Sequence, residues 1–165
     1  NEIERIITEN NLNLYVANDN SPQQVVISGM LENINNSKEI FLKNGIKKFV
    51  LLNVSAAFHS PIMLEAQKNL QPIIDETNFL ENEISIISNF NAQISNVNSN
   101  IKTSLINQMA NRVRWVESIK ALEKHSNSKI IEIGPGKVLS GLIKRISSNF
   151  SINSINSIED INLNV

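Results

Sequence analysis

Histidine is the residue type best suited to acid–base chemistry in this sequence, and His59 is the better placed of its 2 histidines. A free imidazole has a pKa of about 6.5, so it can take up and return a proton near neutral pH. His59 follows a predicted strand at 48–54 and stands before Ser60-Pro61, a pair that favours a helix start. Loops between strands and helices often present catalytic side chains. His59 is therefore a candidate general base, although a lone histidine beside a helix start more often caps or packs.

A second candidate feature is the Gly-Pro-Gly-Lys turn at 134–137, which separates a predicted strand from a predicted helix. Backbone amides at such a helix start can bind an anion, but the spacing is not that of a phosphate-binding Walker A loop. A simple turn is the plainer interpretation. Lys137, Lys144 and Arg145 lie on the same predicted helix. They form either a solvated face or a contact for an acidic partner.

The composition argues against several classes of function. The chain has 165 residues, no cysteine and 2 histidines, which excludes disulfides and thiolate metal sites and argues against a histidine-based one. We therefore expect no metal. A formal net charge of -1 without a basic block gives no electrostatic reason to expect nucleic-acid binding.

No apolar stretch approaches the roughly 20 residues that cross a bilayer, and residues 1–5 do not resemble a signal peptide. We expect a cytoplasmic protein that binds no membrane. The absence of cysteine fits that location. The chain has no initiator methionine and opens within a predicted helix, which indicates that it begins inside a longer protein.

In the first third of the chain, apolar spacing and turn-forming residues predict five elements. They are a helix at 3–10, strands at 12–17 and 24–28 joined by a turn at 18–22, a helix at 31–43 and a strand at 48–54. This order matches a ferredoxin-like unit whose first strand is missing.

The remainder alternates strands with helices, which implies an α/β fold with a mostly parallel, covered sheet. The predicted elements are helices at 60–77, 99–110, 113–125 and 137–148, strands at 84–88, 129–133 and 151–155, and a short terminal helix. We expect two units, a small subdomain at 1–53 and a core at 54–165.

Four stretches resemble, in the same order, the malonyl-CoA:acyl carrier protein transacylases of fatty-acid synthesis. They read NDNSPQQVVISG at 18–29, VSAAFHSPIM at 54–63, QMANRVRW at 108–115 and EIGPGKVLSGL at 132–142. The resemblance covers essentially the whole chain, and Ala57 stands where the family usually has proline. It implies the C-terminal part of an α/β-hydrolase-like acyltransferase core, with a truncated inserted ferredoxin-like subdomain.

The family's reaction passes through a malonyl-serine intermediate. A serine in a G-H-S-x-G elbow takes malonyl from malonyl-CoA and passes it to the phosphopantetheine thiol of acyl carrier protein. The resemblance therefore implies these two partners, with a coenzyme A thioester as substrate and no cofactor.

The resemblance also implies site residues. His59 is the expected general base, and Gln108 matches the segment whose main-chain carbonyl orients it. Phe58 and Asn20 are expected to bind substrate, with the Phe58 ring favouring malonyl over branched acyl groups. Basic residues of the 137–148 helix are the expected contacts for the acidic carrier protein.

The sequence contains no G-H-S-x-G motif, and the family's carboxylate-binding arginine should also lie upstream. We therefore expect the chain to be inactive by itself and poorly stable, because a sheet without its central strands exposes apolar edges. Two alternatives stay open. One is a non-catalytic ferredoxin-like binding module, and the other is the acyltransferase domain of a polyketide-type synthase.

Overall fold

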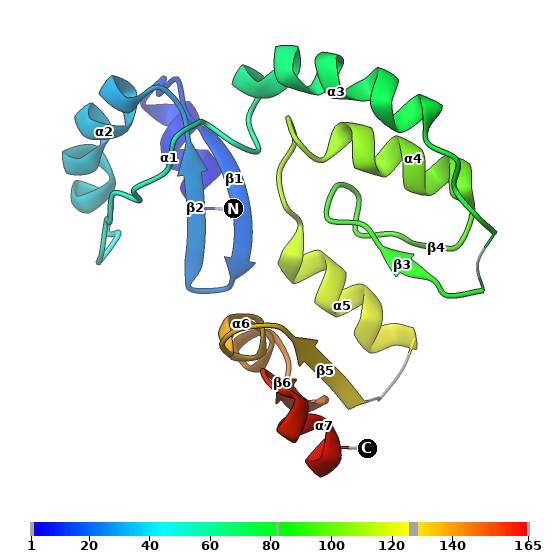
Figure 1. The fold of residues 1–165 in the computed structure, drawn as a ribbon. Helices are drawn as coiled ribbons and strands as arrows, with labels where there is room; N and C mark the ends of the chain where they lie inside the picture. Colours follow the sequence, from blue (N-terminus) through cyan, green and yellow to red (C-terminus); the bar gives the residue numbers. More distant parts are fainter. Residues whose placement is uncertain (1, 82, 126–128, 165) are drawn as a thin grey trace.

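The N-terminal region packs two helices against a β-hairpin (Figure 1). The computed structural model describes residues 2–81, 83–125 and 129–164. The first elements are α1 (Glu2–Glu9), β1 (Tyr15–Ser21), β2 (Gln24–Ser28) and α2 (Leu31–Lys43). Ile6, Leu14 and Phe41 form the buried core between them. The predicted helices and the antiparallel hairpin are confirmed, because each element buries the apolar face that its spacing creates.

Strand β1 is longer than predicted, and the turn predicted at 18–22 is wrong for most of its length. The strand continues to Ser21, and the turn is confined to 22–23. Val113 explains the difference, since its N–H donates to the Ala17 carbonyl (2.8 Å) and its carbonyl accepts from the Asp19 N–H (3.0 Å). This distant partner keeps turn-forming residues extended, so tertiary pairing overrides local propensity.

The strand predicted at 48–54 does not form. None of the described strands pairs with this segment. Phe49 packs against the N-terminal core, but the apolar side chains after it stay exposed: Val50 58%, Leu51 55%, Leu52 52% and Val54 66%. Strands are stabilised by cross-strand neighbours, and among the described residues no strand pairs with this segment. The predicted helix–strand–strand–helix–strand pattern therefore loses its last strand.

The central region is built around two helices that pack side by side, α3 (Leu64–Glu76) and α4 (Asn98–Asn107) (Figure 1). A 3-10 turn, η1 (Pro61–Met63), leads into α3, so the helix predicted at 60–77 begins later than expected. The strand predicted at 84–88 shrinks to β3 (Ile86–Ile87). It pairs antiparallel with an unpredicted strand, β4 (Ile94–Ser95).

The C-terminal region contains α5 (Trp115–His125), β5 (Lys129–Ile133), α6 (Val138–Ile146), β6 (Ser151–Ile155) and α7 (Ile158–Asn164). Strands β5 and β6 are parallel, which confirms the predicted strand–helix–strand unit. A second core of Ile119, Ile143 and Phe150 joins α5 to this unit.

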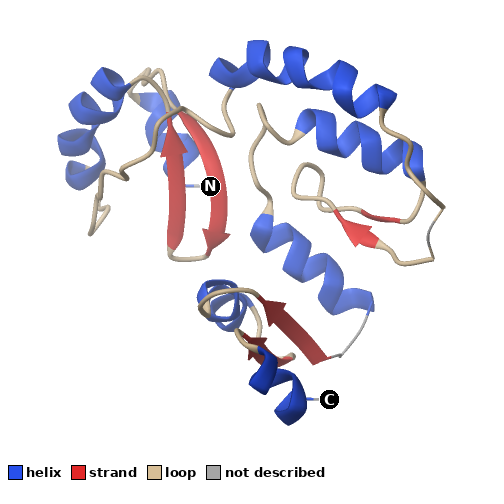
Figure 2. Cartoon of the chain, in the orientation of Figure 1, coloured by secondary structure: helices blue, strands red, loops and turns tan. Residues whose placement is uncertain are grey.

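The described strands do not form one continuous sheet, contrary to the predicted mostly parallel sheet. They make three separate pairs, of which only β5–β6 is parallel (Figure 2). The fold is thus a mixed α/β arrangement. Among the described helices, none combines the length and apolar character needed to cross a membrane.

Candidate active site

His59 lies in a tight turn between the exposed run 50–54 and η1. Its φ of 58° places it in the left-handed region, which costs a non-glycine residue roughly 1–2 kcal/mol. Two hydrogen bonds hold the turn. The His59 N–H donates to the Met109 carbonyl (3.0 Å), and the Ser60 hydroxyl donates to the Ala57 carbonyl (2.6 Å). Strained conformations persist where their surroundings over-determine them, and they concentrate at functional sites.

Ser60, predicted to stand at a helix start, lies at the N-cap position of η1, directly before Pro61. Its side chain makes no cap hydrogen bond and points back to Ala57 instead. Ser60 is completely buried, at 0% exposure. A buried hydroxyl requires a partner, so this bond closes the turn that carries His59.

The His59 ring is oriented by two backbone carbonyls. Its Nδ1 lies 2.9 Å from the Gln108 oxygen and 3.2 Å from the Asn111 oxygen. A carbonyl oxygen can only accept, so the proton of the neutral ring resides on Nδ1. Nε2 then carries the lone pair, which is the form that accepts a proton from a nucleophile. Backbone carbonyls thus fix the tautomer without a buried carboxylate.

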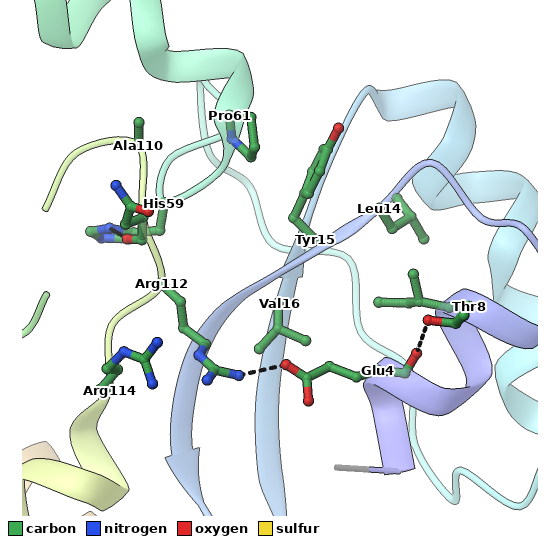
Figure 3. A pocket seen from close by; sticks show the side chains of 12 residues that line it. Glu4, Thr8, Leu14, Tyr15, Val16, His59, Pro61, Ala110, Arg112 and Arg114 are labelled. Atoms are coloured by element: carbon green, nitrogen blue, oxygen red, sulfur yellow. Dashed lines mark hydrogen bonds and ion pairs between the residues drawn. The ribbon is translucent and has the colours of Figure 1, made fainter. Parts of the chain in front are cut away.

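A cavity of about 390 Å³ adjoins this histidine, between α1, β1 and the segment before α5 (Figure 3). Its charged lining comes from Glu4, Arg112 and Arg114. Arg112 Nη1 lies 2.7 Å from Glu4 Oε1, and Arg114 Nη1 lies 2.8 Å from an oxygen of Glu117. The two arginines therefore neutralise carboxylates of the same chain.

The predicted site residues are only partly brought together. Gln108 adjoins His59 through its carbonyl, as expected from the resemblance. Phe58 neighbours His59 in sequence but is 46% exposed, and Asn20 lies near the end of β1. Neither lines the cavity beside His59.

The predicted carrier-protein contacts divide into two groups. Lys137 and Lys144 line a second cavity of about 450 Å³ beside α6 and β6. Arg145 instead turns toward the hairpin, where its Nη1 donates to the Gln24 side-chain oxygen over 3.2 Å.

The start of α6 is occupied by a side chain of the protein itself. The Glu132 carboxylate accepts from the N–H groups of Leu139 (2.9 Å) and Ser140 (2.8 Å) and from the Ser140 hydroxyl (2.5 Å). These bonds, the hydroxyl bond foremost, lower the pKa of Glu132. The Gly136 N–H is likewise taken by the Asn156 side chain. The 134–137 turn is thus a structural turn, and its helix amides bind an internal anion.

Sequence reasoning missed Asn111, Arg112 and Arg114, which flank Val113 in the third resembling stretch. The sequence analysis assigned helices to 99–110 and 113–125 and gave the residues between and beside them no role. Nothing in the sequence indicated that the Asn111 carbonyl reaches His59, because a backbone acceptor has no sequence signature.

Comparison with known proteins shows which proteins this chain resembles in sequence and fold. No protein-family model matches the sequence. The malonyl CoA-acyl carrier protein transacylase of Bacillus subtilis is 36% identical over 160 residues, which cover 97% of this chain and 50% of that protein. The polyketide biosynthesis protein PksE of the same organism is 39% identical, over 89% of this chain and 19% of that protein.

Solved structures agree with these relatives. An acyl-carrier-protein S-malonyltransferase from Burkholderia pseudomallei superposes with a TM-score of 0.91 at 31% identity, covering 98% of this chain and 53% of that one. A malonyl-transacylase in complex with a type II polyketide acyl-carrier protein superposes with a TM-score of 0.88 at 29% identity, covering 97% and 52%.

The relatives and solved structures that share this sequence and fold are named as transacylases and malonyltransferases, which are proteins of an acyltransferase class. In sequence and fold the chain belongs with malonyl-CoA:acyl carrier protein transacylases, which confirms the predicted resemblance, and it corresponds to their C-terminal portion. It spans about half the length of the transacylases it matches.

Proposed function

We propose that this chain supplies the catalytic histidine of a malonyl-CoA:acyl carrier protein transacylase. The supporting observation is the contact of His59 Nδ1 with the Gln108 and Asn111 carbonyls, which leaves Nε2 as the proton acceptor. The sequence has no G-H-S-x-G elbow. We place the nucleophilic serine in polypeptide outside these 165 residues, so the chain alone is inactive.

In the first half-reaction, the serine hydroxyl gives its proton to Nε2 of His59 while its oxygen attacks the malonyl thioester carbon. The C–S bond breaks, and the departing coenzyme A thiolate takes the proton from the imidazolium. In the second half-reaction, the carrier-protein thiol gives a proton to Nε2 and its sulfur attacks the malonyl-serine ester. The ester C–O bond breaks, and the serine oxygen takes the proton back from the imidazolium, so no cofactor or metal is needed.

Other parts of the proposal rest on the family resemblance. Phe58 limits the space for a branched α-carbon, and Asn20 contributes to substrate binding. Residues 1–53 correspond to a ferredoxin-like subdomain and 54–165 to part of an α/β-hydrolase-like core, in a cytoplasmic enzyme. The likeness to PksE favours a second setting, in which the same transfer loads the carrier protein of a polyketide pathway.

A chimera tests the catalytic role of His59. The N-terminal half of the Bacillus subtilis relative is joined to this chain, and malonyl transfer from malonyl-CoA to holo acyl carrier protein is measured. We expect activity that falls by at least about 10³-fold in His59→Ala, because a catalytic unit fails when one member is removed. His125→Ala is the matched control, since His125 ends α5.

Two results would contradict this proposal. One is a folded chimera whose His59→Ala variant transfers malonyl as fast as its parent. The other is a malonyl adduct on the isolated chain. Mass spectrometry after incubation with malonyl-CoA should detect no such adduct, because the nucleophilic serine is proposed to lie outside this chain.

The basic residues of α6 are proposed to contact the carrier protein. Lys144→Glu in the chimera should raise KM for acyl carrier protein more than KM for malonyl-CoA, since like charges repel an acidic partner. Arg145→Glu should have a smaller effect, because Arg145 already contacts Gln24. Equal changes in both KM values would argue against this docking site.

A further inference from the structure

The short loop 108–111 is fastened to the segment that carries His59 by four hydrogen bonds. Three of them involve His59 itself: its N–H to Met109 and its Nδ1 to Gln108 and Asn111. The fourth comes from another side chain, because the Ala110 N–H donates to Oε1 of Gln67 over 3.1 Å. Figure 3 shows Ala110 beside His59 and Pro61.

The Met109–Ala110 peptide unit is held at both of its polar ends. Its carbonyl accepts from the His59 N–H, and its N–H donates to Gln67. A peptide unit is planar and rigid, so fixing the N–H end also fixes the direction of the carbonyl end. That carbonyl in turn holds His59 in its left-handed conformation, at φ 58°.

Gln67 reaches the loop from the first turn of α3, which begins five residues after His59. Its side chain is half-buried, and Ala110 is only 4% exposed. The Ala110 N–H therefore has little access to water, and a buried N–H without a partner is strongly unfavourable. The bond needs an acceptor at position 67, and the amide oxygen of glutamine supplies it.

We propose that Gln67 is a positioning residue for His59. It acts through the Met109–Ala110 peptide and the adjoining carbonyls, and it does not contact substrate. Its importance for catalysis rests on the proposed function. Its effect on the tautomer and orientation of the His59 ring does not. Without the Gln67 acceptor, loop 108–111 is held less firmly, and the His59 ring no longer favours the Nδ1–H tautomer.

The test uses nitrogen-15 NMR of the full chain with labelled histidines, which reports the tautomer of each ring directly. With 2 histidines in the sequence, a His125→Gln variant assigns both signals. Gln67→Met keeps the side-chain size but removes the acceptor. It should lower the ratio of Nδ1–H to Nε2–H tautomer at His59 by about fivefold, the loss of one ordinary hydrogen bond. Gln67→Glu retains an acceptor and should preserve the parent ratio.

Gln71→Met is the matched control, because Gln71 lies on an exposed part of the same helix. It should leave the His59 signals unchanged. Gln67→Asn provides a second test, since its shorter side chain keeps the polarity but cannot span the same distance. An unchanged tautomer ratio in folded Gln67→Met or Gln67→Asn would overturn the proposal. Unfolding of both variants would also overturn it, since it would show a general structural role.

This readout does not require malonyl transfer, so it separates the two proposals. If the tautomer responds to Gln67 but the chimera is inactive, the positioning role stands and the proposed function fails. If the chimera is active and sensitive to His59 but Gln67→Met changes neither tautomer nor kcat, the proposed function stands and the positioning role fails.

Discussion

Two neighbouring regions of this molecule differ sharply in how they are stabilised. The turn that carries His59 is held by hydrogen bonds to loop 108–111, almost fifty residues away in sequence. The run 50–54, only a few residues upstream, leaves four large apolar side chains more than half exposed. The chain therefore fixes the orientation of its histidine internally, whereas its adjacent apolar segment has no covering element among the described residues.

The turn that orients His59 is complete within this chain, whereas the run 50–54 lacks a covering element among the described residues. Backbone hydrogen bonds set the tautomer of His59 within this chain, so this property should survive without further polypeptide. The exposed run has the composition of a strand buried on both faces. It should be the part of the chain that limits solubility.

The largest expected effect is on the N-terminal core. Phe41 is 1% exposed and packs against Phe49 in a tilted arrangement, with ring centroids 5.8 Å apart. Phe41→Ala should lower the free energy of unfolding by about 3–5 kcal/mol, as for other large core truncations. Urea denaturation measures this, with the half-exposed Phe58→Ala as the control. Equal losses for both would show that the packing around α2 is looser than described.

The next effect concerns the turn itself. Ser60→Ala removes the buried hydroxyl bond and leaves the Ala57 carbonyl without this donor. The expected loss of stability is about 1–3 kcal/mol. The His59 tautomer ratio should fall together with it. Ser99→Ala, at the exposed start of α4, serves as the control for loss of a hydroxyl. A loss of stability without a change in the His59 tautomer ratio would show that the Ser60–Ala57 bond does not influence the ring.

Glu132 offers a pH-dependent comparison at the other end of the chain. Hydrogen bonds from Ser140 and Leu139 lower the pKa of its carboxyl in the folded state. The stabilisation is therefore present above the unfolded pKa of about 4.3 and is lost as pH falls through the lower, folded pKa. Glu132→Gln should lower Tm at pH 7, and the difference from the parent should shrink below about pH 4.

The matched control for Glu132 is Glu39→Gln, on the exposed face of α2. It removes one negative charge without touching a helix start, so it should not reproduce the pH-dependent difference in Tm. A difference in Tm between Glu132→Gln and the parent that stays constant from pH 7 to pH 3 would contradict this stabilising role of the Glu132 carboxylate.

Local pattern predicted the elements that complete themselves within a short stretch. The β5–α6–β6 unit and the helices α1 and α2 were predicted because each buries its own periodic face. Strand β1 was underestimated because its extension depends on Val113, which is distant in sequence. The strand at 48–54 failed for the opposite reason, since a strand-like composition does not provide a pairing partner.

The residues of the candidate site also differ in whether the sequence could predict them. His59 could be found from residue type and position, and Gln108 from the family resemblance. Asn111 contributes a backbone carbonyl and Gln67 a single amide oxygen to a loop more than forty residues away. Neither contact has a recognisable spacing, so only the folded structure reveals them.

The smallest expected effect on stability comes from the exposed run, where the comparison can be sharpened most directly. Val54 is 66% exposed and Leu51 55%. Lysine at both positions should change the free energy of unfolding by no more than about 0.5 kcal/mol, since exposed positions away from special contacts tolerate substitution.

The same double substitution should reduce self-association in sedimentation velocity, because added charge disfavours pairing between exposed strand-like segments. In the chimera it should impair activity, since the N-terminal half then meets a charged surface. Loss of stability in the isolated chain would instead show that residues 51 and 54 are already packed, and the contrast with the His59 turn would disappear.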